Sequence, residues 1–348
     1  MDILFDPNKN RMTNMQLCRL YMDEFVRSSE RKWMLDGEAY YRVDNPEIMN
    51  RKMYRYREEK TTGQIEKVLD RSKPNNKRAH GFMHLLIEDK TNYLLSKPYT
   101  LTCEESEEYL SMVQDALGKN FQDRRLMRLG VSASNGGIAW LHPYIDEQGK
   151  FQTMIIPPEQ GIPLWRDNDH EELNGFIWFY NVQVIEGQEQ KTVTKVEYWL
   201  PEAVAYYISD SEGEGWDLRL DSERYLDAVA DENSEFMEHF HIGKEAGNWG
   251  KVPFVPFKNN DYELPDLKFV KSLIDGYDKA RSDVANFLDE VRSIVYALKG
   301  YGGHDLGEFM RDLNYFRAIS LDEDGGAEAI TAPVDIAAAK DDFDTLRK

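Results

Sequence analysis

The sequence has little cysteine, no long apolar run and no excess of positive charge. Its 2 cysteines, Cys18 and Cys103, are too few for a disulfide framework and lack metal-site spacing, so we expect a reducing cytosol. No run of ~18 apolar residues exists, which predicts that no helix spans a membrane. The N-terminus has neither the basic nor the apolar region of a secretion signal, so none is expected.

The charge balance is strongly acidic. The 348 residues include 43 Lys and Arg against 63 Asp and Glu, which gives a net charge of −20. A free DNA-binding protein is normally basic, because neutralisation of phosphates supplies much of its affinity. The sequence is therefore not that of a conventional nucleic-acid binder, and an acidic surface would repel DNA. A hydrophobic content of 41% indicates a folded chain, and the length of 348 residues is enough for two or three domains.

The motifs that carry common enzyme chemistry are missing. The sequence has no P-loop, no dinucleotide-binding glycine pattern and no nucleophile elbow, so we expect no catalytic residue and no cofactor. His239 and His241 have the spacing of one strand face, but no further metal ligand is indicated. Acidic pairs such as Asp341 and Asp342 have the chemistry of a Mg²⁺ site. A surface histidine pair and a solvated acidic face are the preferred interpretations, and no metal is expected.

The chain changes from helical to β patterns near residue 136. Helices are expected over residues 13–35, with Thr13 and Asn14 as candidate caps, from Pro46 onward, and over 79–95, 106–118 and 124–131, whereas 61–78 is expected to be a surface loop. Strands rich in β-branched and aromatic residues are expected in an antiparallel meander. Those strands are 137–146, 151–158, 174–185, 191–200 and 203–209, with shorter ones at 99–103 and 235–243. The sequence therefore predicts an α+β fold.

One long helix is expected from Leu264 to Lys299, with Pro265 in its first turn. Its apolar residues repeat at intervals of three and four and make a narrow stripe. At ~1.5 Å per residue the helix would be roughly 50 Å long. Side-by-side assembly and an ordinary helix across its own domain are equally good interpretations. The stripe comprises Leu267, Val270, Ile274, Tyr277, Val284, Leu288, Val291, Val295 and Leu298.

Four stretches, at residues 33–48, 75–101, 157–180 and 250–303, carry a resemblance to a known family. The last is the most specific: a proline-bracketed strand (KVPFVPF), an Asn pair and a long helix with the central pattern S-D-x-A-N. On these stretches the chain resembles the portal proteins of tailed bacteriophages, of the Gram-positive siphophage type. The resemblance spans nearly the whole chain.

The resemblance implies a ring, usually of twelve subunits, at one vertex of the phage head in the virion, assembled in the host cytoplasm. Double-stranded DNA passes non-specifically through its channel during packaging and ejection, and no membrane is involved. Implied partners are the terminase large subunit, the head-completion adaptor, and the scaffolding and major capsid proteins. The implied domains are the wing (1–262), the first stem helix (263–299), the clip (300–336) and the start of a second stem helix (337–348). The family's tunnel loop, remaining wing and crown are expected to be missing here, as in a C-terminally truncated member.

The resemblance also gives roles to particular residues. Rings of inward-facing bases would steer DNA in an acidic channel, and the acidic clip would suit docking to a basic partner. The channel-lining candidates are Lys268, Lys271, Lys279 and Arg281. The stem-packing seam is Val270, Ile274, Tyr277, Val284, Leu288, Val291 and Val295. The clip docking candidates are Asp305, Glu308, Asp312, Asp322, Glu323 and Asp324.

Two other functions remain as alternatives. The first is a monomeric cytosolic adaptor whose 264–299 helix binds a partner, and self-association of the chain would argue against it. The second is a metal-dependent nuclease that uses the acidic 300–336 segment. A nuclease would need converging carboxylates beside a basic DNA track, and the sequence shows the carboxylates only.

Overall fold

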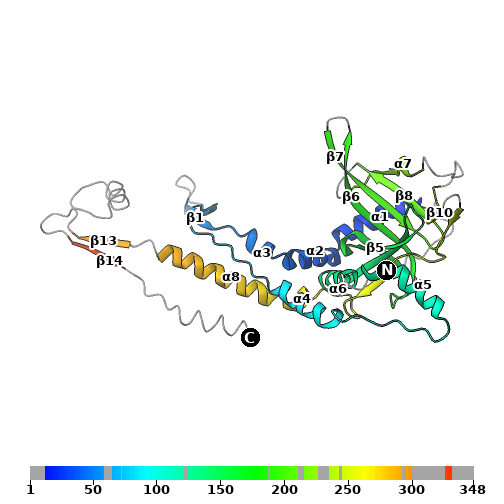
Figure 1. Ribbon diagram of the computed structural model, residues 1–348. Coiled ribbons are helices and arrows are strands. Elements are labelled where there is room, and N and C mark those ends of the chain that lie inside the picture. The colour runs from blue at the N-terminus through cyan, green and yellow to red at the C-terminus, as the bar shows by residue number, and fades with distance from the viewer. Residues whose placement is uncertain are drawn as a thin grey trace. The chain divides into compact units, whose positions relative to one another are not determined.

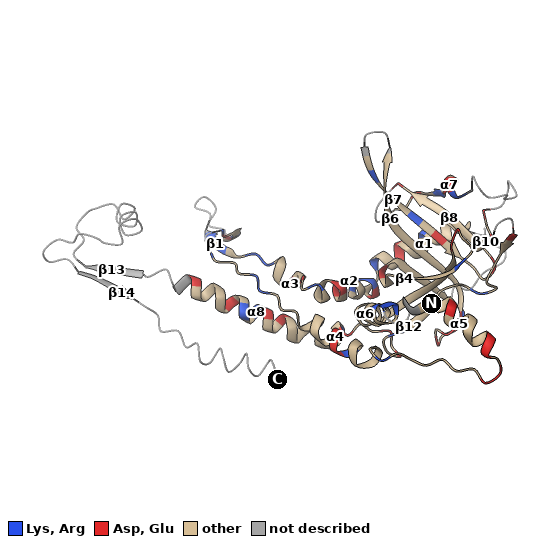
Figure 2. Ribbon diagram, in the orientation of Figure 1, with Lys and Arg blue, Asp and Glu red and all other residues tan. Residues whose placement is uncertain are grey.

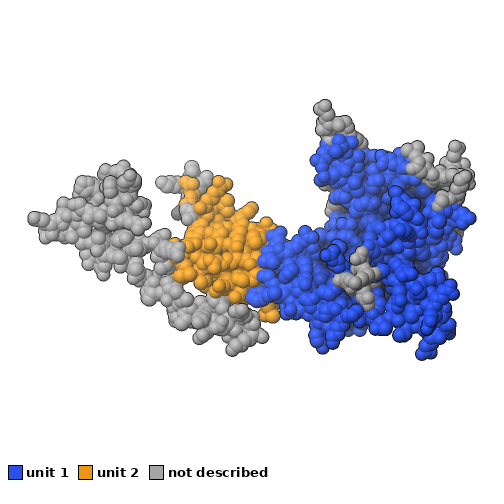
Figure 3. Space-filling model, viewed as in Figure 1, with its two compact units in different colours: residues 1–44, 81–271 blue, residues 45–80, 272–348 orange. Residues whose placement is uncertain are grey.

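The chain divides into two compact units in the computed structural model (Figure 3). Unit 1 comprises Met1–Asp44 and Gly81–Lys271, and unit 2 comprises Asn45–His80 and Ser272–Lys348. The predicted wing, 1–262, thus includes residues that group with unit 2. The structure describes residues 12–58, 65–71, 73–120, 124–186, 189–210, 215–225, 235–242, 245–291, 295–299 and 326–330.

Helices and strands both contribute to the fold, as the α+β prediction requires (Figure 1). The helices are α1 (Asn14–Arg27), α2 (Ser29–Tyr41), α3 (Pro46–Met49), α4 (Phe82–Leu95), α5 (Glu107–Asn120), α6 (Leu126–Gly136), α7 (Ser222–Tyr225) and α8 (Leu267–Val291). The strands are β1 (Tyr54–Glu58), β2 (Ile65–Leu69), β3 (Ile138–Ile145), β4 (Phe151–Ile156), β5 (Gly161–Trp165), β6 (Leu173–Glu186), β7 (Glu189–Trp199), β8 (Val204–Ser209), β9 (Leu218–Leu220), β10 (Phe240–Ile242), β11 (Glu245–Gly247), β12 (Val255–Lys258), β13 (Val295–Lys299) and β14 (Gly326–Ile330). Among these described helices, none is long and apolar enough to cross a lipid bilayer.

Unit 1 is built on two antiparallel sheets. Strands β5 to β9 form a five-stranded sheet in which sequential neighbours pair, as the meander prediction requires. Strands β3 and β4 pair antiparallel in the predicted order, but they form a separate sheet in which β3 also pairs with β12, so the meander is interrupted between β4 and β5. The sequence pattern identified the strands, but their pairing with a strand more than a hundred residues away depends on tertiary contacts.

Aromatic and aliphatic side chains from both sheets make the core of unit 1. Trp140 of β3 packs edge-on against Phe176 of β6, with ring centroids 4.8 Å apart. Helix α1 places Met22 and Cys18 in a second cluster against the five-stranded sheet. Thr13 caps α1 in a reciprocal arrangement with Gln16, which confirms its predicted role.

His142 of β3 is a buried histidine held neutral in this core. Its Nδ1 lies 2.7 Å from the Pro253 carbonyl oxygen, and its ring stacks on Phe254 at a centroid distance of 4.5 Å. Burial lowers the pKa of His142 to about 4. The His142 imidazole is therefore protonated below about pH 6.5 in the unfolded chain, but only below about pH 4 in the folded chain.

We expect stability to fall as the pH drops from about 6.5 towards 4, because only the unfolded state gains the proton in that window. The loss attributable to His142 is on the order of 3 kcal/mol at the acidic end. Replacing it in His142→Phe removes this titration, so urea midpoints measured at pH 7 and pH 4.5 should differ less than in the wild type. An unchanged pH dependence in the variant would contradict the assignment.

Gly137 ends α6 in a left-handed conformation, with φ of 85°. A Cβ there would lie 2.1 Å from the Glu263 carbonyl oxygen. We therefore expect Gly137→Ala to lower the free energy of unfolding by about 3 kcal/mol, because backbone strain and a steric clash add. Gly215→Ala is the matched control, since Gly215 has φ of 83° and nothing within 4 Å of its Cβ position. Denaturant unfolding should show a loss of only about 1 kcal/mol for the control.

Unit 2 consists of part of α8 with the 45–80 segment beside it. Its β1–β2 hairpin is antiparallel, and β13 pairs with β14. The long helix was expected to reach Lys299, but α8 ends at Val291 and Val295–Lys299 forms β13. The run Ile294, Val295, Tyr296 is β-branched and aromatic, so it favours a strand once a partner strand is present.

Several other predicted elements differ from the structure. The helix expected from Pro46 lasts only to Met49, and β1 follows it. The loop expected over 61–78 contains β2, and no strand forms at 99–103. The first two differences have one cause, because β1 and β2 pair with each other across residues 59–64.

Candidate assembly surface on helix α8

One face of α8 is polar and buried within unit 2. Asp278, Ser282 and Asn286 are four residues apart, so their side chains lie on one face of the helix. All three are buried. The 45–80 segment forms hydrogen bonds with all three of these side chains.

Asp278 is the centre of this contact. Its carboxylate accepts a 2.9 Å hydrogen bond from Nδ2 of Asn45 and lies 2.7 Å from Nδ1 of His80. Burial raises the pKa of Asp278, although the contacts with Asn45 and His80 act in the opposite direction. The His80 ring also packs edge-on against Tyr277, with centroids 4.9 Å apart. This arrangement holds the two ends of the 45–80 segment at one level of the helix.

Two further levels of α8 bind the same segment. The Arg78 backbone N–H donates to Oγ of Ser282 at 3.0 Å, and the Asn76 N–H donates to Oδ1 of Asn286 at 2.6 Å. Arg51 forms an ion pair with Asp283. The polar contacts therefore extend over about three turns, and they fix the segment on this side of the helix.

The opposite face of α8 is apolar and largely exposed among the described residues, although Val284 on that face is half-buried. Each residue advances the helix by about 100°, which places Leu273, Val284, Phe287 and Leu288 roughly opposite the polar residues. Leu273 is 60% exposed and Phe287 is 42% exposed. We call these four residues the outer stripe. An apolar face turned away from its own chain is typical of an interaction surface.

The predicted seam is divided between these environments. Ile274 is buried, Val270 and Tyr277 are half-buried, and Val284 and Leu288 belong to the outer stripe. Val291 is the last residue of α8, and Val295 lies in β13. The seam's role in packing between subunits stays a prediction.

The four basic candidates do not share one face of α8. Lys279 and Arg281 are two residues apart, so they point about 160° away from each other. Lys268 lies over the Trp33 ring at 5.6 Å, and Lys271 lies over the Tyr40 ring at 5.3 Å. Figure 2 shows both signs of charge along the helix. Their role in a channel stays a prediction, and one wall of a channel cannot hold all four.

The clip candidates lie outside the described residues. They are Asp305, Glu308, Asp312, Asp322, Glu323 and Asp324.

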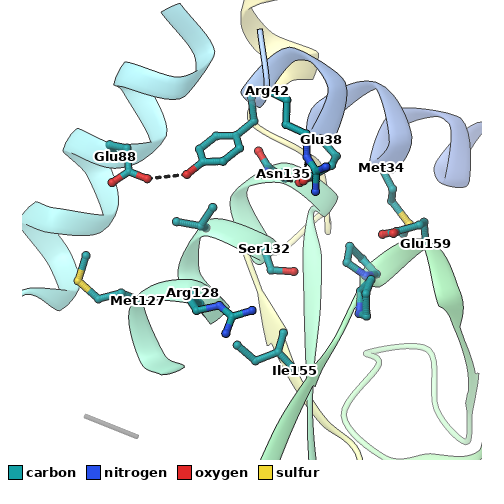
Figure 4. Close-up of a pocket in the computed structure, with 14 residues that line it drawn as sticks. Met34, Glu38, Arg42, Glu88, Met127, Arg128, Ser132, Asn135, Ile155 and Glu159 are labelled. Atoms are coloured by element: carbon teal, nitrogen blue, oxygen red, sulfur yellow. Dashed lines mark hydrogen bonds and ion pairs between the residues drawn. The ribbon is translucent and has the colours of Figure 1, made fainter. Parts of the chain in front are cut away.

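Unit 1 holds a cavity of about 520 Å³ between α2, α4, α6 and β4 (Figure 4). Glu38 is paired with Arg42 at 2.6 Å and accepts from Asn135, and Glu88 accepts a 2.6 Å hydrogen bond from Tyr41. Two of its three carboxylates are thus already engaged. The lining includes a serine but no histidine, so it lacks a Ser-His pair.

The histidine pair considered as a metal site is also engaged. His239 is held by backbone groups on both ring nitrogens, by the Leu200 carbonyl at 2.9 Å and the Trp249 N–H at 3.1 Å, whereas His241 is exposed. Within the described ranges, no group of three or more His, Cys, Asp or Glu side chains is arranged to hold a metal ion.

Sequence reasoning missed the polar face of α8. Its signal was available, because Asp278, Ser282 and Asn286 repeat at the interval of four that marks one helical face. The spacing alone does not distinguish a buried polar face from a solvent-exposed one. The residues that bind this face, Asn45, Asn76 and His80, are some two hundred residues away in the sequence. Only the fold brings these groups together.

Comparison with known proteins gives consistent matches. Residues 27–348 match the family described as "Phage portal protein, SPP1 Gp6-like". The chain is 33% identical over 307 residues to the portal protein of Bacillus phage SPP1. The aligned region covers 88% of this chain and 57% of that protein. The chain is 28% identical over 336 residues to the portal protein of Clostridium phage phiCD119, which covers 92% and 68% respectively. The chain thus spans less than two thirds of the length of the first relative.

Proposed function

Because the chain belongs to the SPP1 Gp6-like family of phage portal proteins, we propose that it is a subunit of the ring through which double-stranded DNA enters and leaves the phage head. The outer stripe of α8 is the observation that carries the assembly part of this proposal. Within the described part of the chain, the 45–80 segment covers one face of the helix with polar groups, and the apolar face is largely exposed. Contact with a neighbouring copy would bury that face.

The proposed domain roles follow the family order. Residues 1–262 act as wing, 263–299 as first stem segment, 300–336 as clip and 337–348 as the beginning of a second stem helix. The stem segments stand around the channel. Within this arrangement, α8 presents its outer stripe to the next subunit and its polar face to its own 45–80 segment.

The proposed partners are other components of the phage head. A ring of about twelve copies occupies the portal vertex of the virion after assembly in the host cytoplasm, together with scaffolding and major capsid proteins. The acidic clip docks first the terminase large subunit and then the head-completion adaptor. DNA passes without sequence readout, because an acidic surface offers few binding sites for phosphate. Inward-facing lysines such as Lys279 steer the duplex.

We propose no catalysis by this chain, so that the docked terminase supplies the ATP hydrolysis that drives packaging. This fits the engaged carboxylates of the unit 1 cavity. The nuclease alternative concerned residues 300–336, outside the described ranges, and no described residue favours it.

Native mass spectrometry of the purified chain, followed by negative-stain imaging of large species, tests the proposal. We expect closed rings of about twelve subunits with a central hole. A chain that stays monomeric at all concentrations would contradict the ring and favour the adaptor alternative, in which α8 binds a different protein.

A further inference from the structure

The β1–β2 hairpin of unit 2 is a second surface with exposed apolar side chains among the residues that the structure describes. Tyr56 is 75% exposed and Ile65 is 72% exposed. Tyr54 pairs with Leu69 across the hairpin, and both are exposed. Alternate residues of a strand share a face, so the two tyrosines lie on one side of the hairpin with the two aliphatic residues, and we call these four residues the tyrosine face. Lys67 lies on the same side, with its Nζ 4.4 Å from the centre of the Tyr54 ring.

An isolated two-stranded hairpin is only marginally stable in water. The tyrosine face therefore gains stability from any apolar surface that packs on it. The contacts between the hairpin and α8 determine where an apolar surface that packs on the hairpin has to lie. Arg51, just before β1, contacts Asp283, and Asn76, after β2, contacts Asn286. Asn76 thus binds on the polar side of α8, whereas Arg51 reaches Asp283, which lies between the polar side and the outer stripe.

Unit 2 therefore has two different exposed apolar surfaces, one on the hairpin and the other on α8. Such an arrangement favours a head-to-tail contact, in which one surface of each copy meets the other surface of the next. In a ring, rotation about the axis relates neighbouring copies, so equivalent residues of all copies lie at the same height along that axis. The hairpin is anchored at the level of residues 283–289, so it would meet the stripe of the next copy near Phe287.

The charge of the 45–80 segment also favours a second copy of this chain as the partner. Residues 45–80 contain ten Lys and Arg against five Asp and Glu, whereas the whole chain has a net charge of −20. Arg55 and Arg57 are exposed and alternate with the tyrosines along β1, where Figure 2 marks Lys and Arg. A basic segment in an acidic protein is attracted to a second copy of that protein. Nucleic acid would satisfy the arginines but would leave the aliphatic half of the tyrosine face without an apolar partner.

We propose that the tyrosine face of one copy docks on the outer stripe of α8 in the next copy, near Phe287. This inference rests on the proposed ring and names the groups that close it. The contact joins Tyr54, Tyr56, Ile65 and Leu69 of one copy to Val284, Phe287 and Leu288 of its neighbour. The surrounding arginines contribute attraction between copies at low salt.

Two complementary variants test the contact. Tyr56→Asp disables the tyrosine face, and Phe287→Asp disables the stripe, and neither side chain belongs to the buried core. Each variant alone should lose rings in native mass spectra. An equimolar mixture should give 1:1 heterodimers, because one intact tyrosine face then meets one intact stripe. Ile185→Asp is the matched control, since Ile185 is 76% exposed at the β6–β7 end, and it should assemble as the wild type does.

The other outcomes are distinguishable. Wild-type rings together with normal rings from both variants would overturn the contact and leave the proposed function standing. Dimers from each variant alone, with no heterodimer on mixing, would mean that each surface pairs with itself, which also overturns it. Rings of Tyr56→Asp that have lost retention of linear duplex DNA would make the hairpin a nucleic-acid contact instead. A wild-type chain that never assembles would overturn both proposals. Amide hydrogen exchange on each variant confirms that unit 2 is folded.

Discussion

Placing an aspartate on the outer stripe of α8, in Val284→Asp or Leu288→Asp, is expected to abolish assembly of the chain into rings. An unpaired carboxylate at an apolar contact costs about 3 kcal/mol for each copy that buries it. That lowers the association constant of each contact by roughly 100-fold. A ring contains many such contacts, so the effect is multiplied around the circle.

The measurement is the mass distribution of each variant by light scattering at the concentration where the wild type assembles. Ser272→Asp is the matched control, because Ser272 is exposed on the same helix but lies off the stripe. Normal rings from Val284→Asp and Leu288→Asp would show that the stripe is not a contact between subunits. Loss of rings in Ser272→Asp as well would show a general charge effect on α8.

Asp278→Ala is expected to loosen the 45–80 segment from α8 and to lower the stability of unit 2 by about 3 kcal/mol, within the range for breaking a buried polar network. The substitution removes the buried carboxylate that binds Asn45 and His80, and leaves a cavity in its place. Asp278→Asn keeps an acceptor oxygen for Asn45 and should lose less. Both variants leave the outer stripe unchanged.

Amide hydrogen exchange over residues 272–289 measures this effect locally, and denaturant unfolding measures it globally. Lys279→Ala is the control on the neighbouring, exposed position and should change stability by no more than about 0.5 kcal/mol. Protection in Asp278→Ala equal to that of the wild type would contradict the role given to the polar face.

The sequence predicted the strands of unit 1 better than any other part of the fold. Residues 174–185 and 191–200 alternate β-branched and aromatic side chains, and the structure places strands over both. The β1–β2 hairpin was missed although YRYRE alternates tyrosine with arginine as a strand does, because this alternation is only five residues long. Its register depends on pairing across residues 59–64, which a local pattern does not specify.

The sequence predicted the helix that carries the outer stripe, but not which of its apolar residues are exposed. The interval of three and four residues correctly predicted a helix with an apolar stripe over most of 264–299. It did not indicate that Ile274 would be buried while Leu273, one residue earlier, would be exposed. That difference arises because the 45–80 segment binds Asp278, Ser282 and Asn286, and thereby determines which face of the helix the chain itself covers.

Thiol labelling on α8 tests most directly whether the outer stripe is a contact between copies. Leu273→Cys and its neighbour Ser272→Cys would each be made with Cys103→Ser, since the remaining Cys18 is buried. We predict that Leu273→Cys reacts with a maleimide as a monomer and is protected in the ring fraction, whereas Ser272→Cys keeps a similar reactivity in both. Equal labelling of Leu273→Cys in monomers and rings would contradict the account.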